Sequence, residues 1–177
     1  RKKAVWVSKS AGLIKDARRD FGGIGGDPQL IFAKPNSPDA PITQKEGVLF
    51  ITYDSLKTVA KQKGEKNTRS RLDQILEWLG EDSDGVIAFD EAHAMGNAIA
   101  VRGVRGATKP SQTALTGVKI QDSIPQARVV YVSATGATEV KNLGYATRLG
   151  LWGENTPFAN VVSFINHIVT GGVAAME

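Results

Sequence analysis

Short apolar segments rich in β-branched residues recur along the chain. They lie at residues 4–7, 30–33, 48–52, 86–89 and 129–132. Their apolar positions are nearly continuous rather than alternating, which is typical of strands that a parallel sheet buries on both faces. We therefore expect five buried strands.

Helical patterns separate most of these strands. Apolar residues within 72–79 recur with the spacing of one helix face, and this helix should end near Gly80. Ser111 is placed to cap a second helix, and Thr156 followed by Pro157 is typical of the start of a third. Strands that alternate with helices predict an α/β fold with a mostly parallel sheet.

Four other stretches interrupt this pattern. Residues 34–46 contain three prolines, and residues 96–110 combine glycines with basic residues, so both are predicted to be exposed loops. The glycines within 22–26 follow a helical pattern and are interpreted as a helix C-terminal turn. Residues 57–71 carry six basic residues and one acid, Glu65. This segment is either a solvated helix face or a surface for an anionic partner.

Composition narrows the class of protein. Of the 177 residues, 41% are apolar and 23% charged, which is ordinary for a globular chain and excludes a disordered tail, a collagen or a coiled coil. No apolar run approaches the roughly 20 residues that cross a bilayer, so we expect no membrane span. The absence of cysteine excludes disulfides, zinc–thiolate sites and thiol catalysis. The net charge of +4 is compatible with an anionic partner.

Residues 85–93 form the most informative string. An apolar strand here leads into two adjacent carboxylates, Asp90 and Glu91, although neighbouring like charges repel and burial penalises both. A catalytic role would explain the two adjacent carboxylates, with Asp90 holding Mg²⁺ through its water shell and Glu91 orienting an attacking water. Both residues follow a strand at its carboxyl end, where parallel sheets bind ligands. The alternative is an acidic helix N-terminus after the strand, since carboxylates favour that end of the helix dipole.

Two short strings resemble the motifs of a known class of motor. Residues 90–93 read Asp-Glu-Ala-His, and the strand at 129–132 is followed by Ser133, Ala134 and Thr135. In this order, each at a strand end, they resemble motifs II and III of superfamily 2 helicases. The chain is therefore similar to the first RecA-like domain of such a helicase.

Longer strings resemble the strawberry notch family across essentially the whole chain. They are GVLFITYDSL at 47–56, DGVIAFDEAHAMGN at 84–97, ARVVYVSATGATEVK at 127–141 and RLGLWGENTPF at 148–158. Residues 6–20 are similar to the strand-to-helix region around this family's motif Ia. The resemblance implies a RecA-like, three-layer α/β/α fold of the P-loop NTPase type, with a mostly parallel sheet that lacks the P-loop strand.

One element of that fold is missing from the sequence. The phosphate-binding string G-x-x-x-x-G-K-[S/T] does not occur in the 177 residues. Residues 1–3 run directly into the first apolar segment, without an initiator methionine or a signal peptide. We therefore expect residues 1–177 to be part of a first RecA-like domain, inactive alone, with the phosphate-binding loop upstream and a second RecA-like domain downstream.

The resemblance assigns roles to individual residues, with ATP and Mg²⁺ as cofactors. Asp90 would hold Mg²⁺ through water, and Glu91 would act as general base or orient the water. His93 would bridge the nucleotide site to motif III, at Ser133 or Thr135. Motif III as a whole, residues 133–135, would couple the nucleotide to nucleic acid.

Nucleic acid is the implied partner, bound through its backbone without sequence preference. Hydroxyls and amines can contact phosphates, although such residues are also ordinary at strand ends. The candidates are Ser8, Lys9, Ser10, Thr52, Lys61, Lys63 and Lys66. The second RecA-like domain and transcription regulators are further implied partners.

Two functions remain open. The first is an ATP-driven helicase-like motor that acts on nucleic acid or chromatin. The second is a non-enzymatic scaffold for transcription regulators that has kept the helicase fold. Intact Asp90, Glu91 and His93 favour the motor. Either protein is expected inside the cell, in the cytoplasm of a bacterium or the nucleus of a eukaryote.

Overall fold

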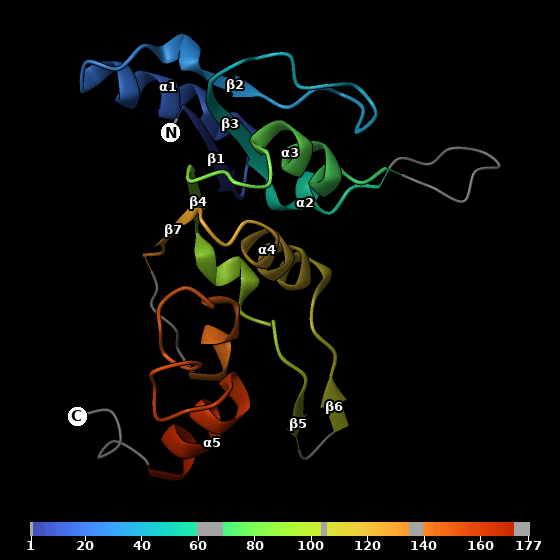
Figure 1. The fold of residues 1–177 in the computed structure, drawn as a ribbon, viewed down its shortest axis with the longest axis vertical. Coiled ribbons are helices and arrows are strands. Elements are labelled where there is room, and N and C mark those ends of the chain that lie inside the picture. The colour runs from blue at the N-terminus through green and yellow to red at the C-terminus, as the bar shows by residue number, and fades with distance from the viewer. Residues whose placement is uncertain (1, 60–68, 104–105, 135–139, 172–177) are drawn as a thin grey trace, which may run out of the picture.

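A five-stranded parallel sheet forms the centre of the molecule. The structure, a computed structural model, describes residues 2–59, 69–103, 106–134 and 140–171. The strand order is β2-β3-β1-β4-β7, and every neighbouring pair is parallel (Figure 1). The strands are β1 (Lys3–Ser8), β2 (Ile31–Ala33), β3 (Gly47–Thr52), β4 (Val86–Asp90) and β7 (Arg128–Val132). All five strands predicted from the apolar segments are present, but the predicted burial on both faces is wrong for β7, whose residues are half-buried or exposed because the sheet is open on one side there.

Helices follow most of the strands, as expected for an α/β fold. They are α1 (Ile14–Gly23), α2 (Tyr53–Leu56), α3 (Arg71–Leu79), α4 (Gln112–Ser123) and α5 (Val161–Gly171). Short 3-10 helices are η1 (Ala11–Leu13), η2 (Pro28–Leu30), η3 (Ala92–Met95) and η4 (Val140–Tyr145). Figure 1 shows α2, α3 and α4 grouped beside the sheet, and α1 near β2. In the part of the chain that the structure describes, no helix is both long and apolar enough to cross a membrane.

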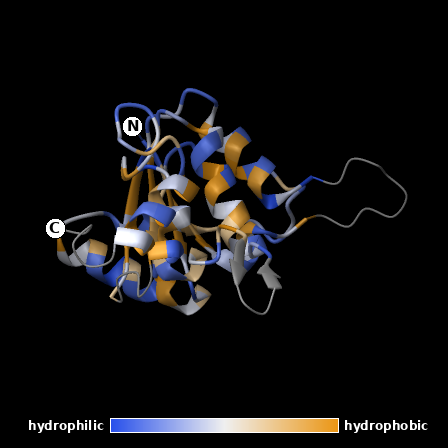
Figure 2. Cartoon of the chain, turned by 90° about the horizontal axis from the view of Figure 1, so that it is seen from below, coloured by the Kyte–Doolittle hydropathy of each residue, from blue (hydrophilic) through white to orange (hydrophobic). Residues whose placement is uncertain are grey.

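The two faces of the sheet pack against different helices. Successive side chains of a strand point to opposite faces. Val5, Leu49 and Phe89 therefore lie on one face, where they join buried residues of α2, α3 and α4 in the main core. Trp6 and Phe50 lie on the other face and pack against α1 in a smaller cluster. The strands are correspondingly mostly hydrophobic along their length in Figure 2.

The α1 side of the sheet is open over β4 and β7 in the described residues. Val86, Val130 and Val132 are 36%, 45% and 51% exposed. The strand register places Val130 beside Ala88 and Val132 beside Asp90, so these valines share the face that α1 covers farther along the sheet. Parallel sheets are normally covered on both faces. The exposed valines therefore form an apolar surface, termed here the open β4–β7 surface.

The helix predicted at residues 72–79 is confirmed. It is α3, which begins after a capping box in which the Ser70 hydroxyl accepts from the Asp73 amide and the Asp73 carboxylate accepts from the Ser70 amide. It ends at Gly80, whose φ of 86° lies in the left-handed region that favours glycine. The glycine turn predicted within 22–26 is also confirmed, because α1 ends at Gly23 and the backbone turns directly after it.

Two other predictions are wrong in part. The last helix begins at Val161 rather than at Pro157, because Asn160 caps it by accepting the Ser163 amide at 3.0 Å. The stretch 96–110 is not entirely loop, since β5 (Val101–Gly103) and β6 (Gly106–Thr108) pair there as antiparallel strands. Each of these strands has three residues, which is too short to give a recognisable apolar pattern.

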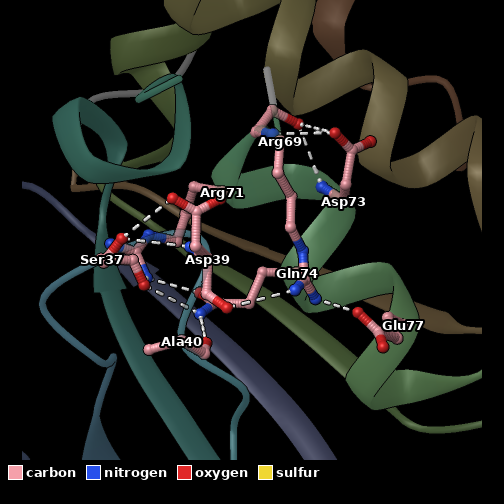
Figure 3. A network of polar contacts seen from close by, with 9 residues as sticks. Ser37, Asp39, Ala40, Arg69, Arg71, Asp73, Gln74 and Glu77 are labelled. Carbon is pink, nitrogen blue, oxygen red and sulfur yellow. Dashed lines mark hydrogen bonds and ion pairs between the residues drawn. The ribbon is translucent and has the colours of Figure 1, made fainter. Parts of the chain in front are cut away.

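The basic segment 57–71 is described only at its two ends. Arg71, at its C-terminal end, is 1% exposed and lies under the proline-containing loop. Its Nη2 donates to the Asn36 carbonyl at 3.0 Å, and Nη1 donates to the Ser37 carbonyl at 3.3 Å (Figure 3). The buried Gln74 amide also donates to the Ser37 carbonyl. Arg71 thus ties the loop at 34–46 to α3 and belongs neither to a solvated face nor to an anion-binding surface.

Candidate active site

The carboxyl ends of four strands meet at one edge of the sheet. Ser8 pairs with Thr52 across β1 and β3, and Asp90 pairs with Val132 across β4 and β7. Ser133 follows β7 directly. Ligands of parallel α/β sheets bind at this edge. The sheet therefore brings residues from distant parts of the sequence to the position where chemistry is expected.

Asp90 is held by hydrogen bonds from two neighbouring segments. The Ser8 hydroxyl donates to Asp90 Oδ2 at 2.8 Å, and the Tyr53 hydroxyl donates to the Asp90 carbonyl at 2.9 Å. Burial, and next the negative charge of Asp90, raise the pKa of the Tyr53 phenol far above its ordinary value. Tyr53 is therefore a protonated donor at every physiological pH.

Glu91 has an unusual backbone conformation. Its φ of 51° and ψ of 48° place it in the left-handed region, which costs a non-glycine residue about 1–3 kcal/mol. The chain here leaves β4 and turns at once into η3. Such backbone strain is concentrated at functional sites. The Glu91 side chain is 38% exposed, so its carboxylate reaches solvent at the edge of the sheet.

His93 connects Glu91 to motif III. Its Nδ1 lies 3.0 Å from Ser133 Oγ and 3.2 Å from Glu91 Oε2. Because a carboxylate oxygen can only accept, a proton on Nδ1 is the arrangement that suits the Glu91 contact. The Ser133 oxygen is then a second acceptor near the same N–H. The contact between His93 and Ser133 that the resemblance implied is present.

Carboxylates are among the oxygen ligands that Mg²⁺ takes at nucleotide sites. Within the described ranges, no group of three or more His, Asp or Glu side chains is arranged to hold a metal ion. Mg²⁺ keeps several of its own waters and is commonly bound by one or two carboxylates together with substrate phosphates. Each carboxylate oxygen has two lone pairs, so the single bond from Ser8 leaves Asp90 able to accept from metal-bound water.

The remaining candidates have different surroundings. Ser8 is fully buried, and its hydroxyl is engaged with Asp90, whereas Lys9 and Ser10 directly after it are exposed. The Thr52 hydroxyl accepts from the Ser55 amide at 3.2 Å and so caps α2. The nucleic-acid role of these residues stays a prediction. For Ser8, a direct phosphate contact would require exposure of a hydroxyl that the fold buries.

Part of the predicted site lies outside the described residues. The residues concerned are Lys61, Lys63, Lys66 and Thr135. Ala134 is described and is exposed. Tyr53 was not among the sequence candidates, although a tyrosine directly after the Thr52 strand end could have suggested it.

A hollow of about 360 Å³ lies at the opposite edge of the sheet. Its lining includes Lys3, Gly47, Gly85 and Arg128, at or next to the amino ends of the strands. Since the carboxylates lie at the carboxyl ends, this hollow is separate from the candidate active site.

Comparison with known proteins identifies the family. Residues 1–177 match the family described as P-loop containing NTP hydrolase pore-1. The chain belongs to this family. It is 44% identical over 183 residues to protein strawberry notch homolog 1 of Gallus gallus, and 42% identical over 184 residues to protein FORGETTER 1 of Arabidopsis thaliana. Both matches cover 100% of this chain, but only 14% and 13% of the respective relative.

These matches confirm the resemblance to strawberry notch proteins and the P-loop NTPase type of fold. The chain therefore belongs to the NTP hydrolase class, for which a nucleotide is the general ligand. Because it spans about one seventh of the Gallus gallus relative, the activity, substrates and partners of the whole protein are matters for proposal.

Proposed function

We propose that this chain is part of the ATP-hydrolysing domain of a helicase-like motor that acts on nucleic acid or chromatin. One observation carries the proposal. At the carboxyl edge of the sheet, Glu91 directly follows Asp90, and its carboxylate lies beside His93, which reaches Ser133 just after β7. A scaffold has no need of a strained backbone that presents two carboxylates together.

Each carboxylate has a distinct part in this proposal. Asp90 would hold Mg²⁺ through its water shell, and the bound ion supplies charge neutralisation of the nucleotide phosphates. Glu91, whose side chain is 38% exposed, would orient the attacking water or accept its proton. His93, with its Nδ1 proton facing Glu91, would transmit the state of this carboxylate to Ser133.

We further propose that another part of a longer protein supplies the phosphate-binding loop. The 177 residues contain no such loop, and the matched relatives are far longer than this chain. The open β4–β7 surface supports this proposal, since its exposed valines offer a further strand and helix an apolar face to pack on. A second RecA-like domain is expected farther along the same polypeptide.

The proposed nucleic-acid partner would bind at the same edge of the sheet. Lys9 and Ser10 are exposed immediately beyond β1, where they are available to phosphates. The basic residues Lys61, Lys63 and Lys66 are proposed to add charge. A role in transcription regulation, and in a eukaryotic source a nuclear location, complete the proposal.

The test uses the full-length protein that contains this chain. We expect ATP hydrolysis that single-stranded or duplex nucleic acid stimulates, with binding that weakens steeply as salt rises. Reversing the charges of Lys61, Lys63 and Lys66 should lower the slope of log affinity against log salt. Binding of transcription regulators without any ATP hydrolysis would instead support the scaffold.

A further inference from the structure

The carboxylate of Asp90 is oriented from outside its own strand. Ser8 is the last residue of β1, and Val7 before it pairs with Phe89, the residue before Asp90 in β4. The Ser8 side chain is fully buried, and its hydroxyl donates to Oδ2 at 2.8 Å. A buried hydroxyl on a central strand has little freedom to move, so this bond fixes the rotation of the carboxylate about its last torsion.

The peptide group after Asp90 is fixed in the same way by Tyr53. The Tyr53 hydroxyl donates to the Asp90 carbonyl at 2.9 Å. Its ring stacks on Phe89, with centroids 6.5 Å apart and planes inclined by 13°, and Phe89 stacks in turn on Tyr131. The three rings form a stacked row near the ends of the strands, and this packing favours the ring position from which the Tyr53 hydroxyl reaches the carbonyl.

This carbonyl belongs to the peptide that joins Asp90 to Glu91. The orientation of that peptide plane sets the direction in which the chain enters Glu91, whose backbone is left-handed. Held by Tyr53, the peptide keeps Glu91 in this conformation and its carboxylate beside His93. One neighbour thus orients the Asp90 carboxylate and the other orients the Glu91 backbone.

We propose that Ser8 and Tyr53 are positioning residues that jointly aim the Asp90–Glu91 carboxylate pair at a Mg²⁺-bound nucleotide. The proposal rests on the proposed function, because the pair has a ligand to face only if the domain binds nucleotide. It replaces the expectation that Ser8 contacts nucleic acid directly. Neither residue touches the reacting atoms, so each acts through Asp90.

The test measures Mg²⁺ dependence in the full-length protein with Glu91 intact, and a non-hydrolysable nucleotide prevents turnover. A fluorescent ATP analogue is titrated at increasing Mg²⁺, and the Mg²⁺ concentration that gives half of the gain in nucleotide affinity is recorded. Partners that orient a metal-site carboxylate typically affect metal affinity by about 10- to 100-fold. Ser8→Ala should therefore raise this concentration at least about 10-fold, and Tyr53→Phe by a smaller factor. Nucleotide affinity without Mg²⁺ should stay unchanged.

Tyr131→Phe is the matched control. It removes the hydroxyl of a half-buried tyrosine that also stacks on Phe89, but this hydroxyl bonds to Gln121 rather than to Asp90. Ser123→Ala controls for loss of a serine hydroxyl on an exposed helix end. Neither control should move the Mg²⁺ dependence. Hydrogen exchange of residues 89–95 without nucleotide adds a readout of the carboxylate segment itself, and it should speed up in Ser8→Ala and Tyr53→Phe but not in the controls.

The outcomes separate this proposal from the proposed function. Wild-type protein that binds Mg²⁺-ATP, with Ser8→Ala and Tyr53→Phe showing unchanged Mg²⁺ dependence, would overturn the positioning role alone. An equal change of Mg²⁺ dependence in Tyr131→Phe, Ser8→Ala and Tyr53→Phe would also overturn the positioning role, because the effect would then come from general destabilisation of the fold. Wild-type protein that binds no nucleotide would overturn the proposed function and this inference with it.

Discussion

Arg148 is expected to be a structural clamp on α4, and its loss gives a sharp test of the fold. The guanidinium donates to the carbonyls of Gln121 at 2.7 Å, Ile124 at 2.9 Å and Pro125 at 2.8 Å. These carbonyls lie at the C-terminal end of α4, which carries partial negative charge. The change Arg148→Met keeps an apolar stem of similar length and removes all three donors.

The size of the effect follows from the partners that remain. In a continuing helix the Gln121 carbonyl would accept from residue 125, but Pro125 has no N–H, so Arg148 replaces the missing donor. The carbonyl of Ile124 keeps a bond from the Ala127 amide, and Pro125 is exposed to water. An unsatisfied buried acceptor costs about 1–3 kcal/mol, and loss of the charge near the helix end about 0.3–1 kcal/mol. The expected total is about 2–3 kcal/mol.

Hydrogen exchange on the full-length protein measures this energy locally. A loss of about 2–3 kcal/mol lowers the protection of the last turn of α4 by between about 30-fold and 150-fold. Arg148→Lys, which keeps the charge but not the planar fork of donors, should fall between wild type and Arg148→Met. The control Arg19→Ala removes an exposed arginine paired with Asp16 and Asp20, and should change no protection in α4. Unchanged protection in Arg148→Met would refute the clamp.

Two further predictions concern motif III and the start of α3. Ser133→Ala in the full-length protein should cost only about 0.5–1.5 kcal/mol of stability and leave basal ATP hydrolysis within a few-fold of wild type. It should abolish the stimulation of hydrolysis by nucleic acid, because His93 loses its contact with motif III. Retained stimulation would show that Ser133 has no coupling role. Burial opposes ionisation of the Asp73 carboxyl, but the hydrogen bonds that it accepts from Ser70 prevail and lower its pKa. The ionised carboxylate therefore stabilises α3 above about pH 4, and this stabilisation is lost as the pH falls further. Asp73→Asn should therefore reduce the hydrogen-exchange protection of α3 at pH 7, and this protection should fall less than in wild type as the pH is lowered. A fall in protection equal to that of wild type would contradict the prediction.

The sheet could be predicted from the sequence because its signal is local. Each strand is a nearly continuous apolar run, and burial on both faces requires such a run. The exception is β2, where Ile31–Ala33 has three residues and gave a recognisable signal only together with Leu30. The paired strands β5 and β6 are as short and contain no apolar run, so the pattern predicts loop there. The start of α5 was misplaced because Thr156 and Asn160 are both capping residues and only tertiary context selects between them.

The candidate site could likewise be predicted only where its residues are close together in the sequence. Asp90, Glu91 and His93 are adjacent in the sequence, so a short string predicts them together. The bond between Ser8 and Asp90 joins residues 82 positions apart, and the bond between Tyr53 and Asp90 joins residues 37 positions apart. These contacts depend on strand order and register, which the apolar pattern does not specify. The burial of Arg71 likewise depends on carbonyls of a loop more than thirty residues away.

ATP hydrolysis by the full-length protein with Glu91→Gln shows whether the carboxyl edge of the sheet is the active site. If Glu91 orients or deprotonates the attacking water, this change should abolish most of the hydrolysis while nucleotide binding stays intact, since the carboxamide keeps the size of the side chain but cannot accept the proton. Glu154→Gln, at an exposed residue far along the chain, is the control and should hydrolyse ATP as wild type does. Glu91→Gln protein that hydrolyses ATP at the wild-type rate would contradict the assignment of this edge of the sheet as the active site.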